Sequence, residues 1–97
     1  MYKLMIFLKR TDDDSVLQHF LNSTMPRLQK LTRQDMVSAV IEGSALNEEK
    51  FTRYCEFVFE SADVLNQLLQ SPEGKELNKD LASYHNNISI FFANYGV

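Results

Sequence analysis

Four short segments are rich in apolar and β-favouring residues, and each divides by the period of two of a strand into two sets of side chains. The predicted strands are Tyr2–Lys9, Asp35–Glu42, Arg53–Glu60 and Asn87–Asn94. Elsewhere the apolar residues recur every three or four positions, as on one face of a helix. The clearest such segment is Ser15–Leu31. The pattern therefore predicts strands and helices alternating along the chain.

Capping residues and prolines predict where the helices begin and break. The acidic run Asp12–Asp14 suits a helix start, because carboxylates favour the N-terminal end of the helix dipole. Pro26 interrupts the first helix, so we expect a kink or restart near Thr24–Met25. Ser61 can cap a second helix. In Ser71-Pro72, a capping serine precedes a proline at the first helical position, which predicts a restart there.

The predicted order of elements is βαββαβ, with a loop over residues 43–52 before the third strand. With right-handed crossovers, this order gives a four-stranded antiparallel sheet with the helices on one face. That is the ferredoxin-like architecture of the α+β class. We expect residues 1–97 to form one such domain.

The two faces of the predicted sheet differ in character. One is wholly apolar and is expected under the helices: Leu4, Ile6, Leu8, Val37, Ala39, Ile41, Cys55, Phe57, Phe59, Ile88, Ile90 and Phe92. The other is mixed: Lys3, Met5, Phe7, Lys9, Met36, Ser38, Val40, Tyr54, Glu56, Val58, Ser89, Phe91 and Ala93. Its apolar members form a patch larger than monomers usually expose. A two-fold homodimer would cover it. The expected interface residues are Phe7, Ser38, Tyr54, Glu56 and Phe91.

Composition narrows the classes of function. Ten Lys and Arg residues face 13 Asp and Glu, a net charge of −3 that is unsuited to general nucleic-acid binding. No apolar run approaches about 18 residues, so no membrane span is predicted. The N-terminal segment lacks the layout of a signal peptide, and a cytoplasmic location is expected. The single cysteine excludes an internal disulfide, and two histidines without ligand spacing predict no metal site.

Several segments together resemble the EthD family of the dimeric α+β barrel superfamily. They are Leu8-Lys9-Arg10, Met25-Pro26-Arg27-Leu28, the third strand Glu56-Phe57-Val58-Phe59-Glu60-Ser61, the restart Ser71-Pro72-Glu73-Gly74-Lys75, and a last helix running into Tyr84. The resemblance covers nearly the whole chain. It implies two ferredoxin-like sheets closed face to face, and cofactor-free oxygenation, cyclisation or isomerisation of small apolar or aromatic compounds, or an accessory role in their degradation. No cofactor is expected.

The chain departs from that family at one position. The family usually carries a His two residues before the proline of the first helix, where this sequence has Thr24. A threonine hydroxyl does not titrate near neutral pH, so Thr24 cannot replace a proton-transferring His. The remaining candidate for acid–base chemistry is His85, at the end of the last helix beside Tyr84.

An apolar pocket between helices and sheet is the predicted ligand site. Its expected ligand-binding residues are Ile6, Phe20, Arg53, Cys55, Phe57 and Tyr84, with Thr24 and His85 as the catalytic candidates. Each polar candidate also has a simpler interpretation. His85 can be an exposed helix-end residue, Arg53 a solvated charge at a strand end, and Cys55 a core side chain. His19 has no acid or cysteine near it in sequence and is expected at the surface.

Two hypotheses about function remain open at this point. In the first, a homodimeric enzyme or enzyme accessory acts on a small apolar or aromatic molecule. In the second, a non-catalytic dimer binds a metabolite or supports a partner, as the missing family His suggests. An enzyme needs at least one titratable group that faces the ligand. An exposed His85 over a filled core would favour the second hypothesis.

Overall fold

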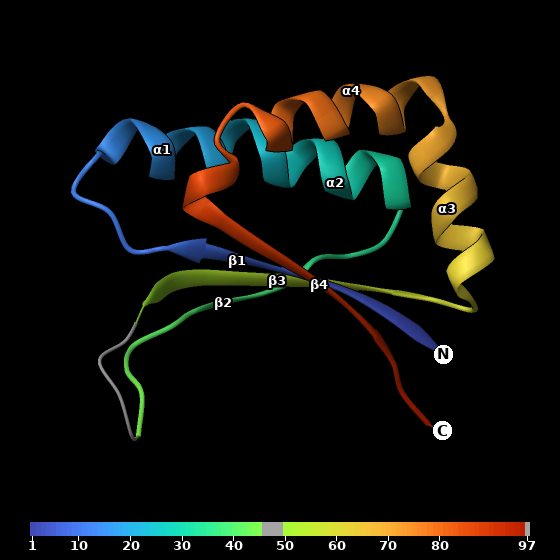
Figure 1. Cartoon of the computed structure of the whole chain (residues 1–97), viewed down its shortest axis with the longest axis horizontal. Coiled ribbons are helices and arrows are strands. Elements are labelled where there is room, and N and C mark those ends of the chain that lie inside the picture. The colour runs from blue at the N-terminus through green and yellow to red at the C-terminus, as the bar shows by residue number, and fades with distance from the viewer. Residues whose placement is uncertain (46–49, 97) are drawn as a thin grey trace.

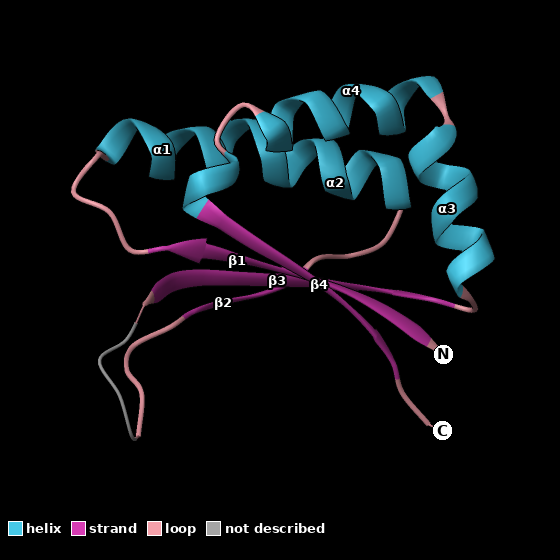
Figure 2. Cartoon of the chain, in the orientation of Figure 1, coloured by secondary structure: helices cyan, strands magenta, loops and turns pink. Residues whose placement is uncertain are grey.

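The computed structural model describes residues 1–45 and 50–96 of the chain. Four antiparallel strands form one sheet in the order β2-β3-β1-β4. They are β1 (Tyr2–Lys9), β2 (Val37–Val40), β3 (Phe51–Phe59) and β4 (Ile88–Asn94). The helices all lie over one face of this sheet, and the other face is bare (Figures 1 and 2). The predicted ferredoxin-like architecture is confirmed.

The helical layer has two parts. The first is α1 (Asp14–His19), a π-helical turn η1 (Phe20–Thr24) and α2 (Met25–Thr32), which follow one another without a loop. The second is α3 (Ala62–Gln70) and α4 (Pro72–Ala82), followed by a short 3₁₀ turn, η2 (His85–Asn87). Figure 1 shows α4 running alongside the first part, with α3 at one end. None of the described helices is long and apolar enough to cross a membrane.

The break in the first helix is a π turn, slightly earlier than the predicted kink. Asp13 caps α1 by accepting a hydrogen bond from the Ser15 amide at 3.0 Å, as the acidic run suggested. The Met25 amide donates to the Phe20 carbonyl, five residues back rather than four. Pro26 has no amide hydrogen to continue the regular ladder. The wider turn absorbs this loss, and Pro26 then sits in the first turn of α2.

The second helical part begins and restarts where the sequence predicted. Ser61 accepts from the Val64 amide at 3.4 Å and Ser71 from the Gly74 amide at 3.1 Å. Gly74 is buried where α4 leaves α3. A Cβ atom there would lie 2.2 Å from the Leu68 carbonyl oxygen. Only glycine therefore allows the two helices to meet this closely.

The core fills the space between the sheet and the helices. The sheet contributes one side of β1, β3 and β4: Leu4, Ile6, Leu8, Cys55, Phe57, Phe59 and Ile88. The helices contribute Phe20, Met25, Leu28, Leu65, Leu77 and Leu81. Burying each large apolar side chain stabilises the fold by about 1.5–3 kcal/mol. The predicted faces of β1 and β3 are confirmed by their register and burial, and that of β4 by its register with β1, although Phe92 on this face is 52% exposed.

The predicted face of the second strand is wrong by one residue. Ser38 pairs with Cys55 and therefore lies on the helix side, whereas Val37 and Ala39 share the open side with Glu56. Ser38 is accordingly not on the face where it was expected to join a dimer interface. β2 is a short edge strand whose four residues are all exposed, so burial does not specify which side each residue takes.

A side chain explains why this strand begins late. The Gln34 amide donates to the Val58 carbonyl at 2.6 Å, and its oxygen accepts from the Val58 amide at 3.0 Å. The Gln34 side chain thus makes the hydrogen bonds with Val58 that a strand backbone would otherwise make. β2 accordingly spans residues 37–40 rather than the predicted 35–42. Of the predicted loop, residues 46–49 lie outside the described residues, and Phe51 and Thr52 already belong to β3.

Candidate functional site

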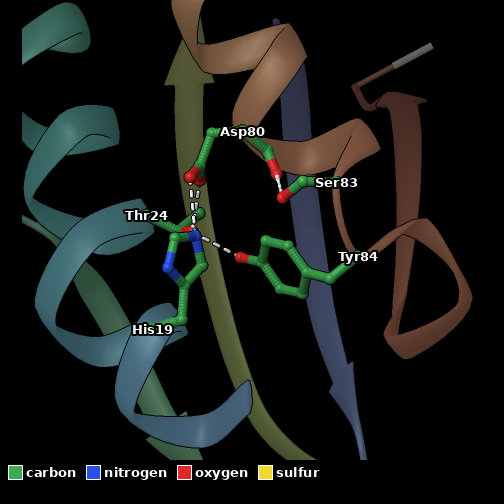
Figure 3. A network of polar contacts seen from close by, with 5 residues as sticks. All are labelled: His19, Thr24, Asp80, Ser83 and Tyr84. Carbon is green, nitrogen blue, oxygen red and sulfur yellow. Dashed lines mark hydrogen bonds and ion pairs between the residues drawn. The ribbon is translucent and has the colours of Figure 1, made fainter. Parts of the chain in front are cut away.

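A buried carboxylate joins the two parts of the helical layer. Asp80 lies on α4, and its side chain is 7% exposed. One oxygen, Oδ1, is 2.6 Å from Nε2 of His19 on α1, and the other, Oδ2, accepts from the Thr24 hydroxyl at 2.6 Å. The Tyr84 hydroxyl is in turn hydrogen-bonded to Thr24. Figure 3 shows all four side chains converging, with Ser83 closing the end of α4.

The π turn is the reason that His19 and Thr24 meet one carboxylate. Positions five apart in a regular α-helix point about 140° away from each other, because a turn holds 3.6 residues. The i to i+5 hydrogen bond of η1 widens the turn between them. Both side chains therefore reach the same side of the first helix, toward α4. π turns of this kind occur often at functional sites.

The protons in this network can be assigned from donor and acceptor counts. Thr24 gives its one hydroxyl hydrogen to Asp80, so Tyr84 must be the donor to Thr24. A carboxylate only accepts, so Nε2 of His19 carries the proton that faces Asp80. In the neutral ring, Nδ1 is then an unprotonated acceptor. The His19 side chain is 40% exposed, which leaves the ring accessible to a ligand.

Two other groups near the core hold their protons more tightly than usual. Burial raises the pKa of Tyr84 to about 12, with a smaller contribution from Asp80 in the same direction and an opposing one from Thr24. Burial also raises the pKa of the Cys55 thiol to about 12. Both groups are therefore neutral near pH 7. Cys55 has the character of a core side chain rather than of a thiolate nucleophile.

The structure brings some of the predicted site residues together and separates others. Thr24 is fully buried and contacts Tyr84. His85 lies apart from them: its side chain is exposed, and Nδ1 is 3.1 Å from the Ala82 carbonyl oxygen. Arg53 is half-buried and donates to the carbonyl and hydroxyl of Thr52. The predicted lining residues Ile6, Phe20, Cys55 and Phe57 are at most 1% exposed, packed in the core.

Sequence reasoning missed His19 and Asp80 as partners. His19 was expected at the surface because no acid lies near it in the sequence. Its carboxylate partner, Asp80, is 61 residues away in the chain. One signal was present for each residue. Asp80 directly precedes Leu81, one of the buried residues of α4, and His19 directly precedes the buried Phe20. A titratable residue at the edge of an apolar stripe is a candidate for a buried polar pair.

A cavity of about 750 Å³ lies near the opposite end of the α2–α4 contact, toward α3. It is lined by Arg27, Lys30, Leu31, Thr32, Arg33, Leu68, Ser71, Glu73 and Glu76. It is thus formed by helices and not by the predicted space between helices and sheet. Within residues 1–45 and 50–96, no three His, Cys, Asp or Glu side chains are grouped to hold a metal ion.

The open face of the sheet carries an aromatic cluster. The ring of Phe7 lies 5.1 Å from Phe51, 4.7 Å from Tyr54 and 5.8 Å from Phe91, measured between centroids. Beside it, the Tyr54 hydroxyl donates to Glu56 at 2.6 Å, and Lys3 Nζ is 2.9 Å from the same oxygen. These bonds lower the pKa of Glu56, with the Tyr54 hydrogen bond the larger cause.

No family model and no curated protein matches this sequence. Among solved structures, the chain resembles an ethyl tert-butyl ether D (EthD) family protein from Bacillus halodurans, with 26% identity, 97% of each chain covered and a TM-score of 0.83. It also resembles a dimeric ferredoxin-like protein of unknown function from Jannaschia sp. (10% identity, 96% of this chain and 97% of the other, TM-score 0.65). A third similar structure is the hydroxynitrile lyase of Passiflora edulis, with 14% identity, 99% of this chain and 95% of the other covered, and a TM-score of 0.64.

All three likenesses extend over nearly every residue of both chains, but the last two, at 10% and 14% identity, concern the fold alone, whereas the first has 26% identity. It agrees with the segments that resembled the same family in the sequence. The helix restart at Ser71-Pro72 and the strand that ends at Phe59 both lie where that resemblance required. The chain therefore has a ferredoxin-like fold and resembles an EthD family protein over nearly its whole length.

Proposed function

We propose that this EthD-like protein is a homodimer that binds a small apolar or aromatic molecule and removes a proton from it with His19. The observation that carries the proposal is the Asp80 carboxylate, which holds Nε2 of His19 at 2.6 Å and is itself 7% exposed. A carboxylate behind an imidazole fixes its tautomer and stabilises the cation formed when the ring takes up a proton. Nδ1 would be the accepting atom.

The proposal also accounts for the departure at Thr24. The family His is absent there, but the π turn places His19 on the same side of the helix as Thr24. His19 would then supply the missing imidazole from one turn earlier. Thr24 would be a positioning residue, because its hydroxyl occupies the second oxygen of Asp80 and leaves the first for His19.

A homodimer formed through the open sheet face is part of the same proposal. The cluster around Phe7 includes Phe91, which is 50% exposed although it is a large apolar side chain. A second sheet would remove this patch from water. Similar folds are described as dimeric. The cytoplasmic location expected from the sequence is retained as part of the proposal.

Deuterium exchange tests the chemistry without knowledge of the natural substrate. A panel of aryl ketones and aryl β-diketones is incubated with the protein in D₂O, and loss of the activated C–H signal is followed by proton NMR. His19→Gln keeps an amide donor for Asp80 but has no basic nitrogen. We expect exchange to be roughly 100-fold slower in this variant than in the wild type for any compound that the protein accepts.

The second histidine, His85, provides a matched control for the His19 variant. His85→Gln alters an exposed imidazole outside the network, so its exchange rate should equal that of the wild type. Equal loss in both variants, or none in either while the wild type catalyses exchange, would refute His19 as the proton acceptor. Circular dichroism and urea unfolding of each variant show whether it has kept its fold.

The dimer is tested by native mass spectrometry. Phe91→Asp places a charge in the open-face cluster and should convert a dimer mass to a monomer mass. Val64→Asp, which alters an apolar residue of α3 that is 38% exposed, should remain dimeric. A wild-type monomer at micromolar concentration contradicts the dimer. An adduct lost on denaturation would give the mass of a bound ligand.

The filled core favours a second candidate function. Phe20, Cys55 and Phe57 pack under the helices with at most 1% exposure, and His85 is exposed. Both features suit a dimer that binds a ligand or a partner without catalysis. In that case a ligand would be retained in native mass spectra equally by the wild type and by His19→Gln, and no compound of the panel would exchange.

A further inference from the structure

The cavity between α2 and α4 has two walls of opposite charge. Its volume of about 750 Å³ falls within the range of small-molecule sites in proteins, roughly 300–1,000 Å³. Arg27 and Lys30 extend from α2, and Arg33 follows at the end of that helix in a left-handed conformation, φ 55°. This wall carries three positive charges, and none of its three side chains forms an ion pair with another described residue.

The facing wall belongs to α4. Glu73, in its first turn, has no ion pair with a described residue, and Glu76 lies 3.5 Å from Lys79 on the outer surface. No cation of the α2 wall comes within 4 Å of either carboxylate among the described residues. The two walls are therefore complementary in charge but separated by the cavity. A ligand between them could contact both.

The remaining lining offers apolar surface rather than free hydrogen-bonding groups. Leu31 and Leu68 are half-buried. The Thr32 hydroxyl already donates to the Leu28 carbonyl at 2.8 Å. Ser71 donates to the Leu68 carbonyl and accepts from the Gly74 amide. The charged groups are thus the polar atoms left to bind a ligand, with a hydrophobic surface beside them.

We propose that this cavity binds a small zwitterion with an apolar side chain, of the kind represented by an aromatic amino acid. Its carboxylate pairs with Lys30 of the α2 wall, and the guanidinium groups of Arg27 and Arg33 add positive charge beside it. Its ammonium group pairs with Glu73. Its side chain covers Leu31 and Leu68. The site shares no residue with the His19 network and does not depend on the proposed proton transfer.

The test uses the full chain and three probes that differ only in charge. L-Phenylalanine carries both charges, 3-phenylpropionate only the carboxylate, and 2-phenylethylamine only the ammonium group. Binding is followed in ¹H–¹⁵N NMR spectra titrated to saturation or to the solubility limit. We expect phenylalanine to shift the amides of residues 27–33, Ser71 and residues 73–76, with an affinity about fivefold higher than that of either singly charged probe.

Charge-neutralising variants locate the contacts. Lys30→Gln and Glu73→Gln should each weaken phenylalanine binding by about fivefold. They should also differ in selectivity: Lys30→Gln removes the preference over phenylethylamine, and Glu73→Gln the preference over phenylpropionate. Lys75→Gln and Glu60→Gln, which alter exposed charges outside the lining, serve as controls and should bind as the wild type does.

Three results would overturn the proposal. The first is an absence of amide shifts in residues 27–33, Ser71 and residues 73–76 with phenylalanine. The second is binding of phenylpropionate as strong as that of phenylalanine, which would indicate a simple anion site. The third is equal affinity in the lining variants and the controls, which would place binding elsewhere. A failure of the deuterium-exchange test leaves each of these results interpretable, because the zwitterion is detected by binding alone.

Discussion

Each side of the sheet carries a carboxylate hydrogen-bonded to a hydroxyl and paired with a basic group, yet the two sets differ in where their partners come from. On the helix side, Asp80 is 7% exposed and is held by residues at least 56 positions away in the chain. On the open side, Glu56 is 19% exposed and is held by Tyr54, two residues before it, and by Lys3 on the neighbouring strand.

This difference shows what each network does for the fold. The Asp80 network joins two helices that no backbone hydrogen bond connects, and its burial makes every unmet bond costly. The Glu56 network follows from a strand pairing that exists without it, because Lys3 and Glu56 lie on adjacent strands. Solvent screens the second network in the isolated subunit. The helix-side network should therefore contribute more to stability.

Removal of the two carboxylates tests this contrast directly and should have the largest effect. Asp80→Ala leaves the buried Thr24 hydroxyl without its acceptor and should lower the free energy of unfolding by about 3 kcal/mol. Glu56→Ala should lower it by less than about 1 kcal/mol. Urea denaturation measures the difference, with both changes made in the Phe91→Asp background, which we expect to be monomeric. Equal losses would contradict the comparison.

Alkaline pH should weaken the contribution of Tyr84 to the helix side, and this effect should be intermediate in size. Burial raises the pKa of Tyr84 from 10 to about 12, so the folded chain keeps this proton when the unfolded chain has lost it. The contribution is complete below pH 10 and is lost as pH rises toward 12. Because water partly screens the phenol, we expect a loss of about 1 kcal/mol. The pH dependence of urea unfolding should be flatter in Tyr84→Phe, and an unchanged slope would count against this cause.

Low pH should weaken the stabilising contribution of the Glu56 network on the open side of the sheet, and this effect should be the smallest of the three. The hydrogen bond from Tyr54 and the ion pair with Lys3 lower the pKa of Glu56, so its contribution is complete above the ordinary value of 4.5. The contribution is lost as pH falls through the lowered value. Glu56→Gln should therefore lose less stability than its parent below pH 4.5 in the Phe91→Asp background. Glu60→Gln is the matched control, and an identical acid profile for both variants would exclude this role.

The sequence was sufficient to predict most helices and strands, because capping residues and hydrophobic periodicity act between residues that are close in the chain. Ser61 and Ser71 cap the helices where predicted, since a capping serine and the amides it accepts from are neighbours in the chain. The strand faces of β1 and β3 followed from the period of two in their side chains, because one face of each is buried. β2 lacks that constraint, and its predicted face was wrong at Ser38.

The candidate site was less accessible from the sequence. Thr24 and Tyr84 could be named from the sequence, because both fall on the apolar stripes of the predicted helices. His19 was assigned to the surface, since neither the π turn nor the distant Asp80 could be inferred from its neighbours. His85 was favoured for its place at a helix end, yet the turn that follows α4 leaves it exposed.

The sequence by itself determined the order of elements, the helix caps and the apolar face of three strands, because periodicity and capping act over a few residues. The tertiary structure alone decided which polar groups meet. Asp80 joins His19 and Thr24 because a widened turn and the packing of α2 on α4 bring them within hydrogen-bond distance. The charged cavity likewise exists only where two helices lie side by side, since long-range proximity depends on packing and not on local pattern.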